Sequence, residues 1–232
     1  DRAMARAKER FILASLMAAS LCLPDPVRAD VSAWPDGVVP RLEALALVQT
    51  LNAEILASPS ATLALEKWCA QHRLAGSGEA KIVARLIRGT PKPATEEQRQ
   101  RLQVGPDEVL GYRRVQLVCG DRVLSEADNW YVPSRLTPEM NRLLDTTDTP
   151  FGKAVQSLQP SRQTYAAKTL WWPLPQGWET QALPAIENGG ALAIPEALFE
   201  HRAVVFSRDR LPLSEVHESY KSPLLDFLPP RR

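Results

Sequence analysis

Apolar residues recur at helical spacing where the folded part of the chain is expected to begin. Between Arg41 and Ala57 an apolar side chain appears every three or four positions, which predicts a helix with one buried face. Ser58-Pro59-Ser60 interrupts the pattern, and a second helix is predicted from there to about Leu74, where Gly76 follows. The fold should therefore start with two helices in succession.

The pattern changes to the two-residue period of strands after residue 80. Alternating and β-branched residues predict strands near 81–89, 109–119, 122–133, 163–172, 200–207 and 212–221. Gly120-Asp121 separates the second from the third and predicts a tight hairpin turn. The segment 173–195 is rich in Pro, Gly and Asn and is predicted to be a long surface loop.

Short helices are predicted between these strands. Thr95-Glu96-Glu97-Gln98 has the form of a capping box, so a helix should follow to about Leu102. Thr137-Pro138-Glu139 supplies a cap, a proline and an early acid for another, and 151–158 should form a third. Helices first and interrupted hairpins afterwards indicate an α+β fold, with a single antiparallel β-sheet and helices packed on one face.

The N-terminal residues have the pattern of a secretory signal. A basic segment precedes the apolar run from Phe11 to Leu23, which is too short to span a membrane, and Val27-Arg28-Ala29 offers small residues for cleavage. A buried amphipathic first helix is the alternative. We expect residues 1–29 to hold the signal peptide (4–29, behind an upstream read-through of residues 1–3), 30–40 to be a linker, and 41–232 to be one domain of a periplasmic or secreted protein.

Composition narrows the partners and cofactors. The chain has 232 residues, of which 44% are apolar and 24% charged, enough for a single core. A formal net charge of +1 gives no reason to expect nucleic acid or an anionic membrane as a partner. His72, His201 and His217 are too scattered to suggest a metal site, and no phosphate-binding loop occurs. Neither a metal nor another cofactor is expected.

Two cysteines, Cys69 and Cys119, would remain after removal of the signal peptide. An even pair in an oxidising compartment permits a disulfide. The alternative, which we favour, is that both are small core residues, because Cys69 lies beside Trp68 on a helix face and Cys119 ends a strand.

Arg113 and Arg114 are adjacent in a predicted strand, so they point to opposite faces of the sheet. An arginine on the core-covered face needs an anion, because an unpaired buried charge is very costly. The alternative is that one arginine is solvated and the other pairs with Glu126 or Asp128 across the hairpin. The pattern alone leaves both possibilities open.

Glu218 is the second candidate for chemistry. It shares a strand face with Val216 and Tyr220, so its carboxyl group should be desolvated, which suits it to proton donation. The alternative is an ordinary charge on an edge strand, where such residues discourage aggregation.

The order of several motifs resembles bacterial chorismate lyase. The likeness covers about 42–220, with a gap at 173–195, and it depends on order because no single motif is specific. The matching residues are Arg114 in the central hairpin, the turn Thr149-Pro150-Phe151-Gly152, Arg202 in a later strand, and His217-Glu218-Ser219-Tyr220 in the closing strand.

This resemblance implies a fold that encloses a small aromatic acid. Chorismate lyases split chorismate into pyruvate and 4-hydroxybenzoate without a cofactor. Carried over, Arg114 would bind the ring carboxylate through a two-pronged contact, and Glu218 would protonate the departing group. Backbone groups near Leu86 and Phe151 would hold the other polar ends of the ligand.

Asp128-Asn129 departs from the resemblance, because the family has a small residue and an arginine there. An Asp128 facing the pocket would neutralise Arg114. The same fold serves as the ligand-binding domain of bacterial regulators, but no DNA-binding helix pair accompanies it here. We therefore expect an exported module that binds a small ligand, with aromatic carboxylates as the leading class and lyase activity lost. An active chorismate-type lyase is the alternative.

Overall fold

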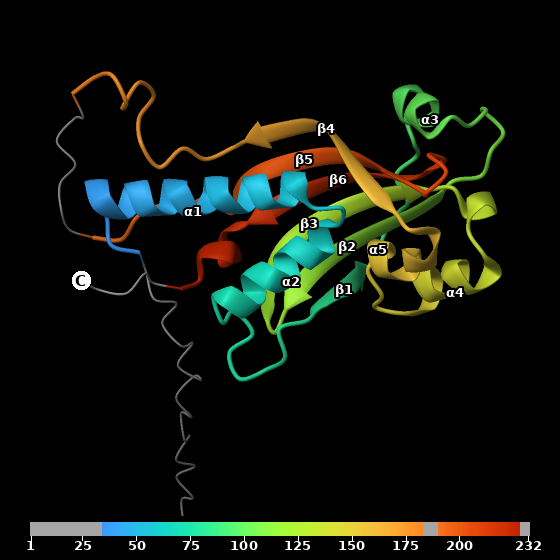
Figure 1. Cartoon of the computed structure of the whole chain (residues 1–232), viewed down its shortest axis with the longest axis horizontal. Coiled ribbons are helices and arrows are strands. Elements are labelled where there is room, and N and C mark those ends of the chain that lie inside the picture. Colours follow the sequence, from blue (N-terminus) through green and yellow to red (C-terminus); the bar gives the residue numbers. More distant parts are fainter. Residues whose placement is uncertain (1–33, 183–189, 228–232) are drawn as a thin grey trace, which may run out of the picture. The chain divides into compact units, whose positions relative to one another are not determined.

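A six-stranded antiparallel sheet forms the centre of the protein (Figure 1). The computed structural model describes residues 34–182 and 190–227, so the predicted signal peptide, the start of the linker and part of the 173–195 loop lie outside the described residues. The strand order is β1-β2-β3-β6-β5-β4. The strands are β1 (Ile82–Ile87), β2 (Gly111–Cys119), β3 (Arg122–Tyr131), β4 (Ser161–Thr169), β5 (Ala197–Phe206) and β6 (Pro212–Lys221).

Helices precede the sheet and fill its connections. The α-helices are α1 (Val38–Ala57), α2 (Ala61–Gln71), α3 (Glu96–Leu102), α4 (Pro138–Thr146) and α5 (Phe151–Ala154), and short 3₁₀ turns are η1 (Pro133–Arg135), η2 (Gln156–Leu158) and η3 (Ser222–Leu225). The predicted α+β class and single antiparallel sheet are confirmed. The helix expected over 151–158 divides into α5 and η2.

Local signals account for several of these boundaries. Thr95 and Gln98 form the predicted capping box at the start of α3, and the Thr137 hydroxyl accepts a hydrogen bond from the Met140 amide at the start of α4. Gly120 adopts a φ of 57° in the β2–β3 turn, a left-handed conformation that favours glycine. Capping and turn chemistry depend on neighbouring residues, so the sequence predicted them well.

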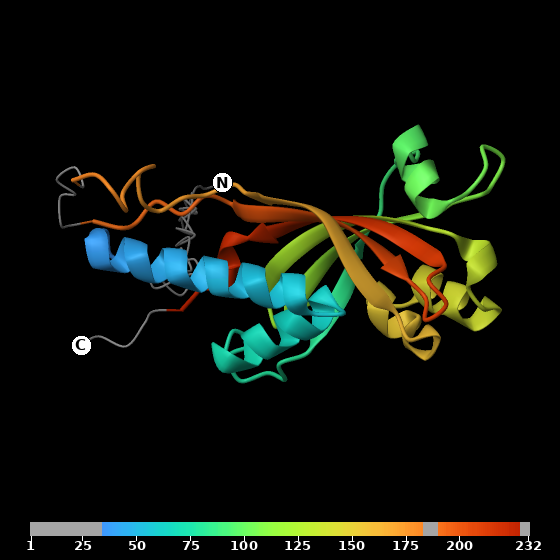
Figure 2. The same cartoon turned by 45° about the horizontal axis from the view of Figure 1, so that its top comes forward.

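The two faces of the sheet are covered differently (Figure 2). Helices α1 and α2 pack on one face, called here the covered face, where Leu51, Ile55 and Leu65 join the main core. The start of α5 lies on the same face, where Phe151 lines a cavity, so the predicted arrangement of helices on one face describes these three. Helix α3 lies on the opposite, open face, because Leu102 packs against Trp130 there.

A disulfide joins Cys69 of α2 to Cys119 of β2. Both residues are fully buried, as expected, but the preferred interpretation of two unpaired core cysteines was wrong. Cys119 pairs in register with Ile82, whose side chain is buried in the same core as Leu65 of α2, so the strand end lies beneath the helix. That proximity is a tertiary property that spacing along the chain does not reveal.

Candidate functional site

A small cavity lies on the covered face, beneath the turn between α1 and α2. Its volume is ≈ 70 Å³. Val115, Ala127 and Val216 of three neighbouring strands form an apolar base, and residues 59–62 and 150–152 cover it. Apolar walls with a few polar groups are typical of small-molecule sites, but those sites usually measure about 300–1,000 Å³, so this cavity is much smaller.

Three polar atoms in the lining of this cavity are buried without a hydrogen-bond partner among the described residues. They are Asn129 Oδ1, Ser214 Oγ and Arg162 Nε. Buried polar groups in folded proteins are nearly always hydrogen-bonded, so each such atom needs an explanation. All three residues line the one cavity, which has room for ordered water that could satisfy these atoms.

Glu218 lines the same cavity and takes part in a buried polar network. Its Oε2 accepts a hydrogen bond from Arg162 Nη2 at 2.5 Å and another from the Tyr220 hydroxyl at 3.0 Å. Arg162 Nη2 also lies 3.5 Å from His201 Nδ1, while His201 Nε2 lies 2.7 Å from Asn52 Oδ1. The network connects the edge strand β4 with β5, β6 and helix α1.

His201 is held in its neutral form by this network. Burial, reinforced by the positive charge of Arg162, lowers its pKa from 6.5 to about 4, although Glu218 opposes the shift. The Asn52 amide nitrogen donates to Gln49, so its oxygen accepts from His201 Nε2–H. His201 Nδ1 is then the unprotonated nitrogen that faces Arg162.

Arg113 is the arginine that points to the covered face. It is 4% exposed, and its two terminal nitrogens donate to the Thr149 carbonyl at 3.4 and 3.3 Å. Burial lowers its pKa; Tyr131, Asp145 and Asp148 oppose the shift from a distance. No carboxylate of the described residues lies within ion-pairing distance of it.

Arg114 and Glu218 are both among the residues that line a groove on the open face, but their side chains point to opposite faces of the sheet and do not face one enclosed cavity. Glu218 is in register with Ala127, and Ala127 with Val115, so the strand alternation puts Arg113 on the same face as Glu218 and Arg114 on the other. Strand alternation along the sequence predicted that Arg113 and Arg114 point to opposite faces of the sheet. Only the register with β6 shows which of them shares the face of Glu218.

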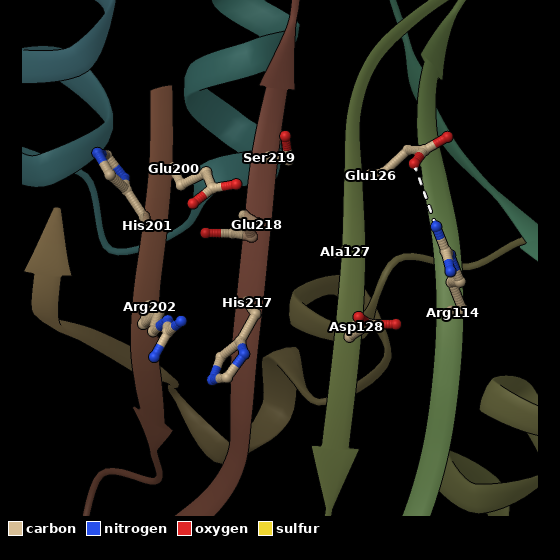
Figure 3. Close-up of a pocket in the computed structure, with 10 residues that line it drawn as sticks. All are labelled: Arg114, Glu126, Ala127, Asp128, Glu200, His201, Arg202, His217, Glu218 and Ser219. Atoms are coloured by element: carbon tan, nitrogen blue, oxygen red, sulfur yellow. Dashed lines mark ion pairs between the residues drawn. The ribbon is translucent and has the colours of Figure 1, made fainter. Parts of the chain in front are cut away.

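Arg114 lies on the open face, in a groove of ≈ 200 Å³ (Figure 3). Its side chain is 44% exposed and pairs with Glu126 at 3.5 Å, as the cross-hairpin alternative predicted for one of the arginines. Asp128 does not neutralise it by contact, because Asp128 bonds to Lys92 and to the Tyr112 hydroxyl. Paired charges of this kind are ordinary on a solvated sheet face.

The other predicted site residues divide between cavity and core. Phe151 lines the covered cavity, whereas Leu86 packs beside Val115 against the main core and is not among the described lining residues. Sequence reasoning missed Arg162, because the strand was expected to begin only at residue 163. Nothing local distinguishes that arginine from a solvated one.

The described residues offer neither a membrane-spanning helix nor a metal-binding cluster. No helix there has the length and apolarity to cross a membrane. No cluster of three or more His, Cys, Asp or Glu side chains that could hold a metal ion occurs in that part of the chain either.

This chain is similar in sequence to a protein of Sinorhizobium fredii and similar in fold to several solved structures. No family model matches the chain. It is 48% identical over 224 residues to the uncharacterized protein y4mC of Sinorhizobium fredii, covering 95% of this chain and 94% of that protein.

Solved structures resemble this chain in fold only. PhnF from Mycobacterium smegmatis is 14% identical over 86% of this chain and 92% of that one, with a TM-score of 0.47. The PhnF effector domain is 16% identical over 71% and 89%, with a TM-score of 0.46. The possible transcriptional regulator YydK from Bacillus subtilis is 16% identical over 65% of this chain and 62% of that one, with a TM-score of 0.37.

Acid should destabilise the protein through His201. Its pKa is lower in the folded state than the ordinary 6.5, so the unfolded chain binds more protons below that pH. The stabilisation is complete above pH 6.5, and roughly 3 kcal/mol should be lost as the pH falls to about 4. Urea unfolding of the wild type and His201→Gln at pH 7 and 4.5 measures this. Equal losses in both proteins would contradict the prediction.

Proposed function

We propose that this chain, which belongs to the same family as protein y4mC of Sinorhizobium fredii, is a binding protein. Its ligand would be a small organic anion held in the covered cavity. The observation that carries the proposal is Arg113, a buried cation without an acid partner among the described residues. Aromatic carboxylates are the leading ligand class, as the resemblance to chorismate lyase suggested.

A bound carboxylate would compensate the charge of Arg113. Burying a charge without a partner costs several kcal/mol, and one neutral carbonyl, that of Thr149, recovers only part of this. Arg113 is not itself a lining residue of the cavity, but it pairs in register with Asn129, which is, so the two are direct neighbours on the covered face. A guanidinium group matches a carboxylate with two parallel hydrogen bonds.

The remaining lining is largely apolar, but the cavity of ≈ 70 Å³ is smaller than the ~150 Å³ that holds benzene, so an aromatic ligand would require residues 59–62 and 150–152 to move outward. Val115, Val216 and Phe151 present apolar side chains between the polar groups of the cavity. Flat apolar rings gain free energy from such burial in proportion to the area removed from water. The ligand would thus be apolar in its middle and charged at the Arg113 end.

Binding without turnover is the function we favour. In the resemblance, Glu218 would donate a proton to the departing group. Here its Oε2 already accepts hydrogen bonds from Arg162 and Tyr220, and the carboxylate belongs to a buried ion pair. A side chain held in this way is suited to shaping the cavity rather than to delivering a proton.

We also propose that the protein is exported. The signal-peptide pattern at 4–29 motivates this, and the disulfide between Cys69 and Cys119 supports it, because structural disulfides persist in oxidising compartments and are rare in the cytosol.

Replacing Arg113 should weaken the binding of an aromatic carboxylate. In titration calorimetry with benzoate, Arg113→Met should lose at least about tenfold in affinity, because it removes a charge-assisted contact. Arg113→Lys keeps the positive charge but cannot form two parallel hydrogen bonds. Its benzoate affinity should therefore lie between those of the wild type and Arg113→Met.

The neighbouring arginine provides the matched control. Arg114→Met makes the same chemical change one residue away on the open face and should leave benzoate affinity unchanged. Thermal unfolding of both variants checks that each is folded. Equal losses in the two variants, or binding that survives Arg113→Met, would refute the proposed site.

Chorismate should not be consumed. Incubation of the purified protein with chorismate should yield no 4-hydroxybenzoate by absorbance, because Glu218 forms a buried ion pair with Arg162 and is not suited to donate the proton. Enzymatic production that disappears in Glu218→Gln would favour the lyase alternative instead.

The exported protein should begin near Asp30 and carry the disulfide. N-terminal sequencing of the secreted or periplasmic protein checks the cleavage, and its intact mass should be lower by two hydrogen atoms than that of the reduced form. Cys119→Ser should remove this difference. A cytoplasmic protein that retains Met4 would contradict export.

A further inference from the structure

We infer that a hollow in the loop after β4 is a second binding site and that its ligand is a neutral oligosaccharide. The hollow lies within residues 172–179, and Trp172 and Trp178 are among its lining residues, so it is called here the tryptophan hollow. Its volume of ≈ 560 Å³ falls within the range of about 300–1,000 Å³ that is usual for small-molecule sites. It shares no lining residue with the covered cavity, so the two sites are independent.

The loop that forms the hollow is attached to the body of the protein. Arg41 of α1 donates through Nη1 to the Pro173 carbonyl at 3.1 Å, so the loop, orange in Figure 1, lies beside the start of α1. Leu174 is only 3% exposed, and the Trp178 amide donates to the Pro175 carbonyl at 3.2 Å within the turn that follows. A loop fixed in this way loses little further conformational freedom when a ligand binds.

The tryptophans of the hollow differ from the fully buried tryptophans elsewhere in the protein. Trp34, Trp68 and Trp130 each donate the indole N–H to a backbone carbonyl, at 2.8, 3.0 and 2.8 Å. Among the described residues neither Trp172 nor Trp178 has such an acceptor, and Trp172 is 60% exposed. Exposed aromatic side chains that gather at one place mark interaction sites, since they combine an apolar ring with a polar N–H.

The other groups of the hollow distinguish between classes of ligand. Gln176 and Glu179 line it, are exposed, and make no side-chain hydrogen bond or ion pair within the part of the chain that the structure describes. An anionic ligand would meet the carboxylate of Glu179 and no lysine or arginine among the described lining residues. A wholly apolar partner would remove Gln176, Glu179 and the indole N–H groups from water without replacing their hydrogen bonds.

A neutral sugar matches both kinds of surface. A pyranose ring has a face of C–H groups, which can pack on an indole ring, and hydroxyl groups around its edge that donate and accept hydrogen bonds. The hydroxyl groups could donate to Glu179 and could exchange hydrogen bonds with the amide of Gln176. Trp172 and Trp178 offer two aromatic rings, which favours a ligand of more than one sugar unit.

Titration calorimetry of the full chain with tetrasaccharides tests the inference. The neutral probes are cellotetraose, maltotetraose and tetra-N-acetylchitotetraose, and tetragalacturonate is the anionic comparison. At least one neutral probe should bind, and tetragalacturonate should bind about tenfold or more weakly than that probe. Glu179→Gln should narrow this difference, because it removes the negative charge from the hollow.

Replacement of Trp172 tests the role of the aromatic ring. Trp172→Ala should weaken binding of the neutral tetrasaccharide about tenfold or more, and should leave the unfolding temperature nearly unchanged because the side chain is exposed. Trp171 provides the matched control, since it packs against the main core and is not a described lining residue. Trp171→Ala should lower the unfolding temperature while the folded protein keeps its affinity for the tetrasaccharide.

Three results would overturn the inference. They are the absence of binding to all three neutral tetrasaccharides, binding that survives Trp172→Ala, and binding of a decaproline peptide in place of the sugars, because aromatic grooves also take proline-rich segments. None of these results bears on the covered cavity, whose ligand is tested separately by the benzoate titration of the Arg113 variants.

Discussion

The buried ion pair between Arg162 and Glu218 organises the covered side of the sheet. Arg162 lies on the edge strand β4 and Glu218 on β6, so the pair spans β5. Both side chains are almost fully buried, and removal of either partner would leave an uncompensated charge at a cost of several kcal/mol. The pair orients Tyr220 and sets the charge beside the cavity, so the properties of the site depend on it.

On the open face, the buried charge of Glu215 also has hydrogen-bonding partners. Glu215 is fully buried there, and burial alone would raise its pKa, but hydrogen bonds from three side chains outweigh this and lower the pKa to about 2. The donors are His217, Arg101 and Tyr165. Through Arg101, this carboxylate attaches α3 to the sheet, so among the described residues a buried acid on each face connects separate elements.

Arg113 differs from both acids because its charge is not matched by a contacting partner among the described residues. Glu215 and Glu218 show that this protein supplies partners where a buried charge is structural. An arginine without one, next to a cavity with unpartnered polar atoms, is therefore the feature that a purely structural account leaves unexplained. The disulfide connects α2, which covers this cavity, to β2, which lines it, and so limits how far the two can separate.

The sequence by itself determined the class of fold, the capped helix starts and the β2–β3 turn, because periodicity, capping and turn conformation depend on residues close in the chain. It also showed that Arg113 and Arg114 point to opposite faces. The tertiary structure alone decided that Arg113 shares its face with Glu218, that Arg162 is the partner of Glu218, and that Cys69 meets Cys119. Each of these depends on strand register or helix packing between residues far apart in the chain, and a shift of one residue in register would have exchanged the two arginines.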